Sequence, residues 1–162
     1  MIRLTEAECI ELKRIKDMLH TNPELSLNEY TTTEIIKRKL TELGIELIPF
    51  GLPTGVVGRV KGKNSSVCIA LRSDIDALSH TERADVSPIS GVPGVMHGCG
   101  HDFHTTCLLG AAILLSKEQP PCDVLLVFQH AEEIMEGARQ LVAKGLFDYP
   151  IVRMYGMHNR PE

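Results

Sequence analysis

The stretch "MHGCGHDFHTT", residues 96–106, gathers several side chains that can bind a metal ion within one segment broken by glycines. It contains His97, Cys99, His101 and His104. Imidazole and thiolate groups are ligands that zinc and similar divalent ions prefer. Each histidine taken alone is equally typical of a solvated loop, and Cys99 could be a small buried residue. Glycines on both sides of Cys99 favour a close approach of the backbone to another group.

Polar side chains also follow three apolar segments, each at the point where a predicted strand ends. They are Ser73, Asp74 and Asp76 after "VCIALR", His130, Glu132 and Glu133 after "DVLLVFQ", and His158 and Asn159 after "VRMYG". Open α/β sheets place their sites beyond the carboxyl ends of the strands, so we expect these groups to converge with the histidine-rich loop. The spacing is not that of a zinc finger, and a site would be assembled by the fold from four separate segments.

Each of these polar groups also has a purely structural interpretation. Glu132 and Glu133 open a predicted helix, where the helix dipole favours carboxylates. Asp74 and Asp76 could cap a turn, and His158 could be a hydrogen-bonded histidine at a strand end. Their joint placement at one edge of the sheet favours a metal site over these separate explanations.

The elements that must position these residues alternate between helices and strands along the chain. Helical periodicity covers residues 5–20, 26–43, 102–117 and 132–145, with capping boxes at Thr5/Glu8 and Ser26/Glu29 and helix ends at Gly44 and Gly145. Short segments rich in β-branched residues lie between them, and residues 79–98 are predicted to form a long functional loop. This order predicts a three-layer α/β sandwich with a mostly parallel central sheet flanked by helices. The segments "GVVGRV" and "VCIALR" are expected to pair as an antiparallel hairpin.

Length and composition bound the class of protein. The 162 residues suffice for one domain with a hydrophobic core, and the net charge of -4 predicts neither nucleic acid nor an anionic membrane as a partner. No apolar run is long enough to span a bilayer, and the charged, amphipathic N-terminus does not resemble a secretory signal. The five scattered cysteines do not form a disulfide framework, so we expect a reducing, cytoplasmic compartment.

Five stretches together resemble the N-terminal part of the metal-dependent amidohydrolases of the aminoacylase and carboxypeptidase family. They are "HTNPELSLNEYTT", "ALRSDIDAL", "MHGCGHDFHTT", "FQHAEE" with the following "EGA", and "YGMHNRPE". The branch they resemble contains N-acyl-amino-acid amidohydrolases, hippurate hydrolases and auxin-conjugate hydrolases. The resemblance implies that residues 1–162 form a single domain, the N-terminal portion of a catalytic α/β domain, ending about where a lid and dimerisation domain is inserted in the family.

The resemblance also implies a set of roles and a reaction. Its metal ligands would be Cys99, His101, Glu133 and His158, its general base Glu132, and its supporting carboxylate Asp74. The cofactors would be two divalent ions, chosen among zinc, manganese, cobalt and nickel. The reaction would be hydrolysis of the amide bond of a small N-acylated amino acid or peptide-like substrate. Asp102 is a candidate partner for a ligand histidine by its proximity in the sequence alone.

The chain departs from the family pattern at two places. His130 stands where the family usually has proline, and "LSHTER" stands where it has "LPI.E".

One alternative function is a non-catalytic metal-binding or interaction remnant of the fold. A thiol redox protein centred on Cys99 is disfavoured, because no Cys-x-x-Cys motif is present and Glu132, Glu133 and His158 would have no role. An interrupted sheet would expose a strand edge and apolar surface, which predicts self-association.

Overall fold

A five-stranded sheet in the order β1-β2-β4-β3-β5 forms the middle of the computed structural model, which describes residues 2–83 and 87–159. The strands are β1 (Glu46–Ile48), β2 (Val56–Val60), β3 (Asn64–Asp74), β4 (Cys122–Gln129) and β5 (Ile151–Gly156). Strand β3 pairs in parallel with β4 and β5, whereas β2 pairs antiparallel with β1 and β4. All the described strands except β2 therefore run in one direction, which confirms the mostly parallel sheet.

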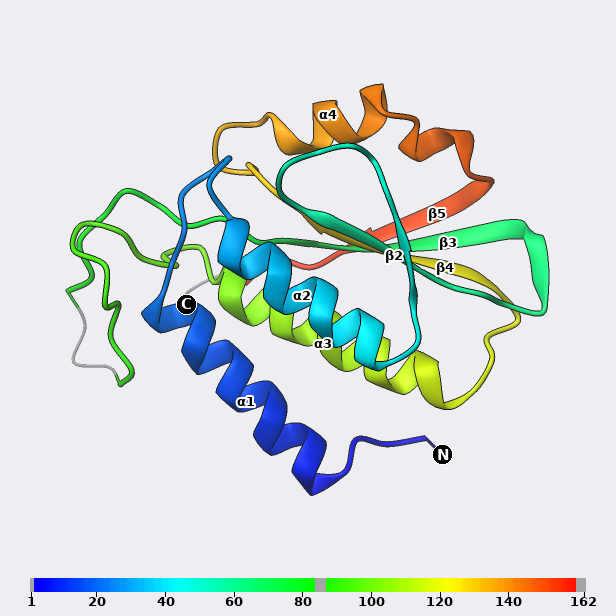
Figure 1. Ribbon diagram of the computed structural model, residues 1–162, viewed down its shortest axis with the longest axis horizontal. Helices are drawn as coiled ribbons and strands as arrows, with labels where there is room; N and C mark the ends of the chain where they lie inside the picture. Colours follow the sequence, from blue (N-terminus) through cyan, green and yellow to red (C-terminus); the bar gives the residue numbers. More distant parts are fainter. Residues whose placement is uncertain (1, 84–86, 160–162) are drawn as a thin grey trace.

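Helices cover both faces of this sheet and give the fold three layers (Figure 1). The helices α1 (Glu6–Thr21), α2 (Tyr30–Glu42) and α3 (His101–Lys117) lie on one side, and α4 (Gly137–Ala143) with the 3-10 turn η1 (Leu146–Asp148) lies on the other. Along β4, Val124, Leu126 and Phe128 pack in the core beneath the first three helices. The alternate residues Leu125 and Val127 pack in the core beneath α4. Because β4 is buried on both faces, it reads in the sequence as an unbroken apolar run.

The predicted hairpin between β2 and β3 is wrong, because β4 lies between these two strands. Residues 61–63 cross over the start of β4, where the N–H of Lys63 donates to the carbonyl of Pro120 at 2.9 Å. A Cβ on Gly62 would lie 2.1 Å from the carbonyl carbon of Cys122, so only glycine fits this crossing. The N–H of Gly62 also donates to Asp123 Oδ1 at 2.8 Å. A three-residue connection thus joins strands that are not neighbours.

The capping box at the start of α1 is confirmed. The Thr5 hydroxyl accepts a hydrogen bond from the Glu8 N–H at 3.2 Å, and the Glu8 carboxylate accepts one from the Thr5 N–H at 2.7 Å. Helix α2 also ends as predicted, with Gly44 in the left-handed region at φ +69°.

The second predicted capping box, between Ser26 and Glu29, is wrong. The Ser26 hydroxyl donates instead to Asp76 Oδ2 at 2.6 Å, and Glu29 makes no side-chain cap on α2. The carboxylate of Glu24 caps this helix, because its two oxygens accept hydrogen bonds from the N–H groups of residues 31 and 32. The side chains of Ser26 and Glu29, which the local sequence pattern assigns to the start of α2, therefore bind distant residues instead.

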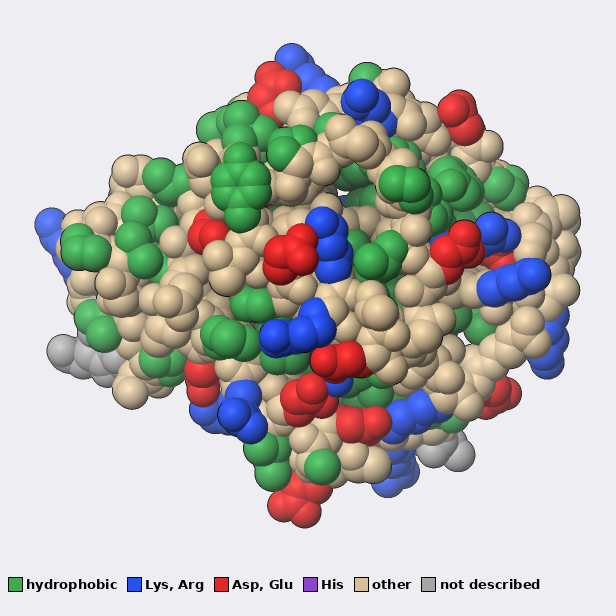
Figure 2. All heavy atoms as spheres, viewed as in Figure 1, with side chains coloured by type: hydrophobic (Ala, Val, Ile, Leu, Met, Phe, Trp, Pro, Cys, Tyr) green, Lys and Arg blue, Asp and Glu red, His purple; other side chains and the backbone are tan. Residues whose placement is uncertain are grey.

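Acidic and basic side chains are interspersed on the helical face, without a large patch of one sign (Figure 2). Some pair across elements, as Lys39 of α2 does with Glu11 of α1 at 2.6 Å. Within the described part of the chain, no helix combines the length and the apolar character that crossing a membrane requires.

Candidate metal centre

The polar residues predicted to converge do meet at one edge of the sheet. Asp74 at the end of β3 pairs in register with Gln129 at the end of β4, and Arg72 pairs with Gly156 at the end of β5. The chain leaving β5 returns to the start of α3, where the N–H of Asn159 donates to His104 Nε2 at 2.8 Å (Figure 1). The carboxyl ends of three parallel strands and the start of one helix therefore border the same region.

Two groups of possible ligands form there. Cys99, His101 and Glu133 each offer a ligand atom, and these atoms lie within 4.8 Å of one another. A second group satisfies the same limit and consists of Asp74, His101, His104 and His158. The four ligands implied by the family resemblance therefore do not form a single group, because His158 lies in the second. His101 belongs to both groups.

The orientation of His101 indicates a missing positive charge. Its side chain is 1% exposed, and Nδ1 lies 2.9 Å from the carbonyl oxygen of Asp76, so this nitrogen is the donor. The other nitrogen, Nε2, has no hydrogen-bond partner among residues 2–83 and 87–159 and lies 3.5 Å from Asp74 Oδ1 and 3.6 Å from Glu133 Oε1. A lone pair that faces carboxylate oxygens is repelled unless a proton or a metal cation lies between them.

The pKa values of Asp76 and His101 also indicate that this region favours a positive charge. Burial raises the pKa of Asp76, but hydrogen bonds from His101, Ser26 and the Glu133 N–H outweigh it and lower the pKa to about 2. Burial lowers the pKa of His101, but the bond to Asp76 and the nearby carboxylates outweigh it and raise the pKa. The Asp76 carboxylate thus stays ionised, and the surroundings of His101 favour a positive charge at its imidazole.

Without a bound cation, the thiol of Cys99 stays protonated at neutral pH. Burial, contact with Glu133 and the charges of the neighbouring carboxylates raise the pKa of this thiol to about 11. A thiol of that pKa is not a free nucleophile at neutral pH, which counts against a redox role. A divalent ion bound beside it would reverse the local field and deprotonate it. The donor set of thiol, imidazole and carboxylate therefore fits zinc or a similar ion.

His104 belongs to the site, although the sequence alone does not distinguish it from a solvated loop histidine. It is buried, its Nδ1 donates to Asp74 Oδ1 at 2.6 Å, and its Nε2 accepts from Asn159. Both nitrogens are thus engaged, and His104 positions Asp74 rather than waiting for a ligand. The spacing His101-x-x-His104 carried the signal, because residues three apart lie on one face of a helix. His97 is also buried, and burial lowers its pKa to about 4.

Glu132 and Glu133 do not open a helix, so the predicted helix over 132–145 is wrong in its first part. Helix α4 begins only at Gly137, and Ala131 and Met135 of the preceding turn have φ values of +47° and +58°. The N–H of Glu133 donates to Asp76 Oδ2 at 3.0 Å. The helix dipole therefore does not account for these two carboxylates.

Asp102 is not the partner of a ligand histidine. Its carboxylate contacts His20 Nδ1 of α1 at 2.8 Å. His20 Nε2 contacts Glu82 at 3.0 Å, so this set ties α1 and the long loop to the start of α3. The partner of His101 comes instead from the segment that follows β3, where Asp76 accepts its hydrogen bonds.

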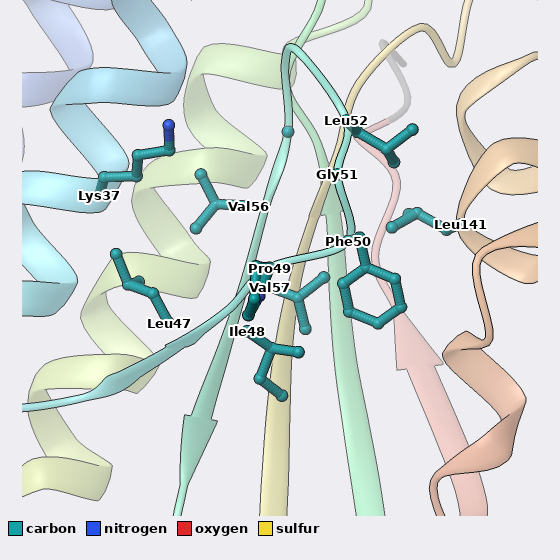
Figure 3. Close-up of a pocket in the computed structure, with 11 residues that line it drawn as sticks. Lys37, Leu47, Ile48, Pro49, Phe50, Gly51, Leu52, Val56, Val57 and Leu141 are labelled. Carbon is teal, nitrogen blue, oxygen red and sulfur yellow. The ribbon is translucent and has the colours of Figure 1, made fainter.

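A separate cavity of about 350 Å³ lies between α2, the loop after β1, and α4 (Figure 3). Its wall is apolar, with Leu47, Phe50, Leu52 and Leu141 around it and Lys37 as the charged lining residue. None of the candidate ligands lines it. A cavity without acid, base or metal-binding pairs does not compete with the sheet edge as a catalytic site.

Comparison with known proteins agrees with this picture. A model of peptidase family M20/M25/M40 matches residues 70–162, a segment that contains every proposed ligand and the proposed base. The chain is 44% identical over 154 residues to N-acetyl-L-cysteine deacetylase of Bacillus subtilis, covering 94% of this chain and 37% of that protein. It is 40% identical over 152 residues to hippurate hydrolase of Campylobacter jejuni, covering 93% of this chain and 40% of that protein.

Among solved structures, the YXEP protein of Bacillus subtilis, described as a dinuclear metal binding peptidase from the M20 family, matches with a TM-score of 0.92 and 40% identity. The match covers 98% of this chain and 45% of that one. The chain therefore spans less than half the length of these relatives.

Proposed function

The chain belongs to peptidase family M20/M25/M40, and on this premise we propose that it is the N-terminal portion of the catalytic domain of a dinuclear metal-dependent amidohydrolase. In this proposal residues 1–162 act as one unit of the catalytic domain. The observation that carries it is the unpartnered Nε2 of His101, which faces the carboxylates of Asp74 and Glu133.

We assign metal binding to Cys99, His101, Glu133 and His158. Asp76 and His104 hold the site from outside, since the first orients His101 and the second engages Asp74. Partners of this kind fix the tautomer and the direction of the ligand side chains. The ligand atoms fall into two groups, with Cys99 and Glu133 in the first and Asp74 and His158 in the second, which supports two ions rather than one. The free Nε2 of His101 can bind only one of these ions.

Bound divalent ions supply positive charge that lowers the pKa of water and polarises an amide carbonyl. Glu132 then acts as the general base, a role supported by its carboxylate lying 3.9 Å from His101 Nε2 with its side chain 39% exposed to solvent. Its carboxylate accepts a proton from the attacking water and returns it to the nitrogen of the leaving amine. Glu133, more buried and close to Cys99, serves as a ligand instead.

The substrate we propose is an N-acylated amino acid or a related small amide. The relatives named above act on N-acetyl-L-cysteine and on hippurate, both of which are amides of an amino acid. Zinc, manganese, cobalt and nickel all suit the donor set.

Elemental analysis of the purified chain and of a Cys99→Ser variant tests the metal site. We expect one or more divalent ions per wild-type chain and a loss of metal in the variant, because a serine hydroxyl does not ionise as a thiol does. A folded wild-type chain that binds no added zinc or manganese would contradict the proposed site.

A Glu132→Gln variant separates binding from chemistry. It should keep the metal content of the wild type while losing hydrolysis of N-acetyl-L-cysteine and hippurate. If wild type and variant bind metal alike and neither hydrolyses an amide, this chain is a metal-binding remnant of the fold.

We further propose that two copies of this chain associate through β5. This strand is at one edge of the described sheet and pairs only with β3, and Val152 and Tyr155 on it are 61% and 50% exposed. An edge with free N–H and C=O groups and apolar side chains is a template for pairing. Sedimentation of the wild type should show a dimer that Val152→Lys disrupts, and a monomer at all concentrations would contradict the proposal.

A further inference from the structure

The turn that carries Glu132 and Glu133 is held by two buried carboxylates from distant parts of the chain. Asp76 accepts a hydrogen bond from the Glu133 N–H at 3.0 Å. Glu29 accepts one from the Ala131 N–H at 2.7 Å, across 102 positions of the sequence. The backbone N–H groups immediately before and after Glu132 are thus both anchored by carboxylates.

Glu29 does not serve its own helix. It lies at the N-cap position of α2 but makes no side-chain cap there, and the carboxylate of Glu24 binds the free N–H groups of that helix end instead. The side chain of Glu29 is fully buried, its Oε1 binds Ala131, and its Oε2 is without a hydrogen-bond partner in the described structure. Burying a carboxylate with so few donors is unfavourable, so stability alone does not explain it.

The residue that Glu29 holds is itself in an uncommon conformation. Ala131 is fully buried with φ +47°, in the left-handed region that residues with a Cβ rarely adopt. Its carbonyl accepts hydrogen bonds from the N–H groups of Glu136 and Gly137, both at 3.1 Å. A Cβ on Gly137 would lie 1.6 Å from the carbonyl oxygen of His130, so the turn closes tightly on itself. Strained backbone of this kind persists where its surroundings hold it, and here it directs the two glutamates.

We propose that Glu29 is a positioning residue of the active site, which fixes the Ala131 peptide and thereby the directions of Glu132 and Glu133. This inference rests on the proposed function, because it assigns Glu29 a purpose through the roles of those two residues. Small displacements of a general base or a ligand are costly, since catalysis and metal binding both depend on geometry.

The test compares Glu29→Ala and Glu29→Gln with the wild-type chain, and Glu24→Ala is the matched control. Glutamine keeps an oxygen that can accept from the Ala131 N–H, whereas alanine removes it. Glu24 also binds backbone N–H groups at the start of α2, so its loss disturbs that helix without touching the turn. Three experiments are made: Zn²⁺ affinity by chelator competition, hydrogen exchange of the Ala131 amide by NMR, and steady-state kinetics with N-acetyl-L-cysteine, which give kcat and KM.

Glu29→Ala should lower Zn²⁺ affinity by about 10-fold, because Glu133 is displaced. It should lower kcat by roughly 100-fold with KM within about twofold, because Glu132 is misdirected. The Ala131 amide should exchange faster, and Glu29→Gln should recover most of all three values. Zn²⁺ affinity and Ala131 exchange in Glu29→Ala equal to those of Glu24→Ala would overturn the proposal.

Two further outcomes keep the inference separate from the proposed function. If the wild-type chain binds no Zn²⁺ and hydrolyses no amide, the proposed function fails, and Ala131 exchange in the glutamine and alanine variants decides alone whether Glu29 holds the turn. If Glu29→Ala does not fold, Glu29→Asp replaces it, since its shorter side chain withdraws the oxygen from Ala131. Aspartate and glutamine variants that both match the wild type would then refute the assignment.

Discussion

The two ends of the paired strands β3 and β4 each bury carboxylates, but they are satisfied in opposite ways. At the amino end of β4, Asp123 accepts hydrogen bonds from Gly62 N–H, Ser65 Oγ and Arg59 Nε at 2.8, 3.1 and 2.8 Å. At the carboxyl ends, Asp74 also has donors on both oxygens, from His104 at 2.6 Å and Arg72 at 2.8 Å. Glu133 Oε1 instead faces the lone pair of His101 Nε2 at 3.6 Å and has no hydrogen-bond partner among the described residues. We call the first group the Asp123 cluster and the second the His101 cluster.

The two clusters differ in a way that separates a structural carboxylate from a functional one. The Asp123 cluster is complete, because each oxygen of Asp123 has donors and a cationic guanidinium neutralises it. The His101 cluster is complete only when a proton or a metal ion is added. Burial alone does not distinguish the two, whereas the direction of the hydrogen bonds does.

The largest expected effect comes from Asp123→Ala. This change leaves Arg59 and the Gly62 N–H without their acceptor at the crossing between β2 and β3, and should cost about 3 kcal/mol of the free energy of unfolding. The melting temperature should fall by roughly 6–12 °C. Denaturant unfolding measures this, and Zn²⁺ affinity at a temperature where the variant is folded should stay within about twofold of the wild type. Loss of metal from the folded variant would show that the two clusters are not independent.

Asp76→Asn is the corresponding change at the His101 cluster. It leaves the backbone carbonyl of Asp76 in place but removes the charge of the carboxylate, which accepts from His101 Nδ1 at 3.2 Å and from the Glu133 N–H at 3.0 Å. Zn²⁺ affinity should fall by about 10–100-fold. Isothermal titration measures the affinity. An affinity equal to that of the wild type would mean that His101 does not depend on Asp76 for its orientation, and the distinction between the clusters would weaken.

The sequence predicted much of the frame on which these clusters lie. The apolar run of β4 and the polar residues at three strand ends were informative, because burial on both faces and a shared sheet edge leave marks that are visible locally. The capping box at Thr5 was also predictable from the sequence, because its donors and acceptors lie within four residues of one another. These features depend on short-range chemistry or on strand direction.

What the sequence did not predict depends on contacts between distant segments. The insertion of β4 between β2 and β3 has no local signature other than Gly62 and Asp123, whose meaning appears only once the crossing is seen. The pattern of Ser26 and Glu29 imitates a capping box, yet both side chains bind groups more than 40 residues away. The turn after β4 reads as helix because the residues that hold it in another conformation come from elsewhere.

The response to pH should also separate the two clusters. The pKa of the Cys99 thiol is raised to about 11, so a metal ion must displace its proton at neutral pH, and Zn²⁺ affinity should rise with pH between about 6 and 8. The slope should be steeper in the wild type than in Cys99→Ser by about tenfold in affinity per pH unit, since serine releases no proton. Equal slopes in the two proteins would show that Cys99 is not a ligand.

The Asp123 cluster should be insensitive over the same range. Burial raises the pKa of Asp123, but the hydrogen bonds from Gly62, Arg59 and Ser65 outweigh it and hold the pKa below 3.8. A lowered carboxyl pKa contributes stability that is fully present above the unfolded value of 3.8 and is lost as pH falls through the folded value. The difference in unfolding free energy between wild type and Asp123→Ala should therefore be constant from pH 6 to 8 and shrink below about pH 3.8.

The smallest expected effects come from two variants that each remove one serine hydroxyl, one from each cluster. Ser65→Ala takes a donor from Asp123, and Ser26→Ala takes one from Asp76. Each should cost about 1 kcal/mol of the metal-free unfolding free energy, because each deletes one hydrogen bond to a buried carboxylate. Only Ser26→Ala should also change Zn²⁺ affinity, lowering it about fivefold, since Asp76 orients His101 and the Glu133 turn, whereas Asp123 touches neither. If the two variants lose equal stability but only Ser26→Ala loses Zn²⁺ affinity, the metal-binding role of the His101 cluster is separate from its contribution to folding. An equal loss of Zn²⁺ affinity in Ser65→Ala would refute this conclusion.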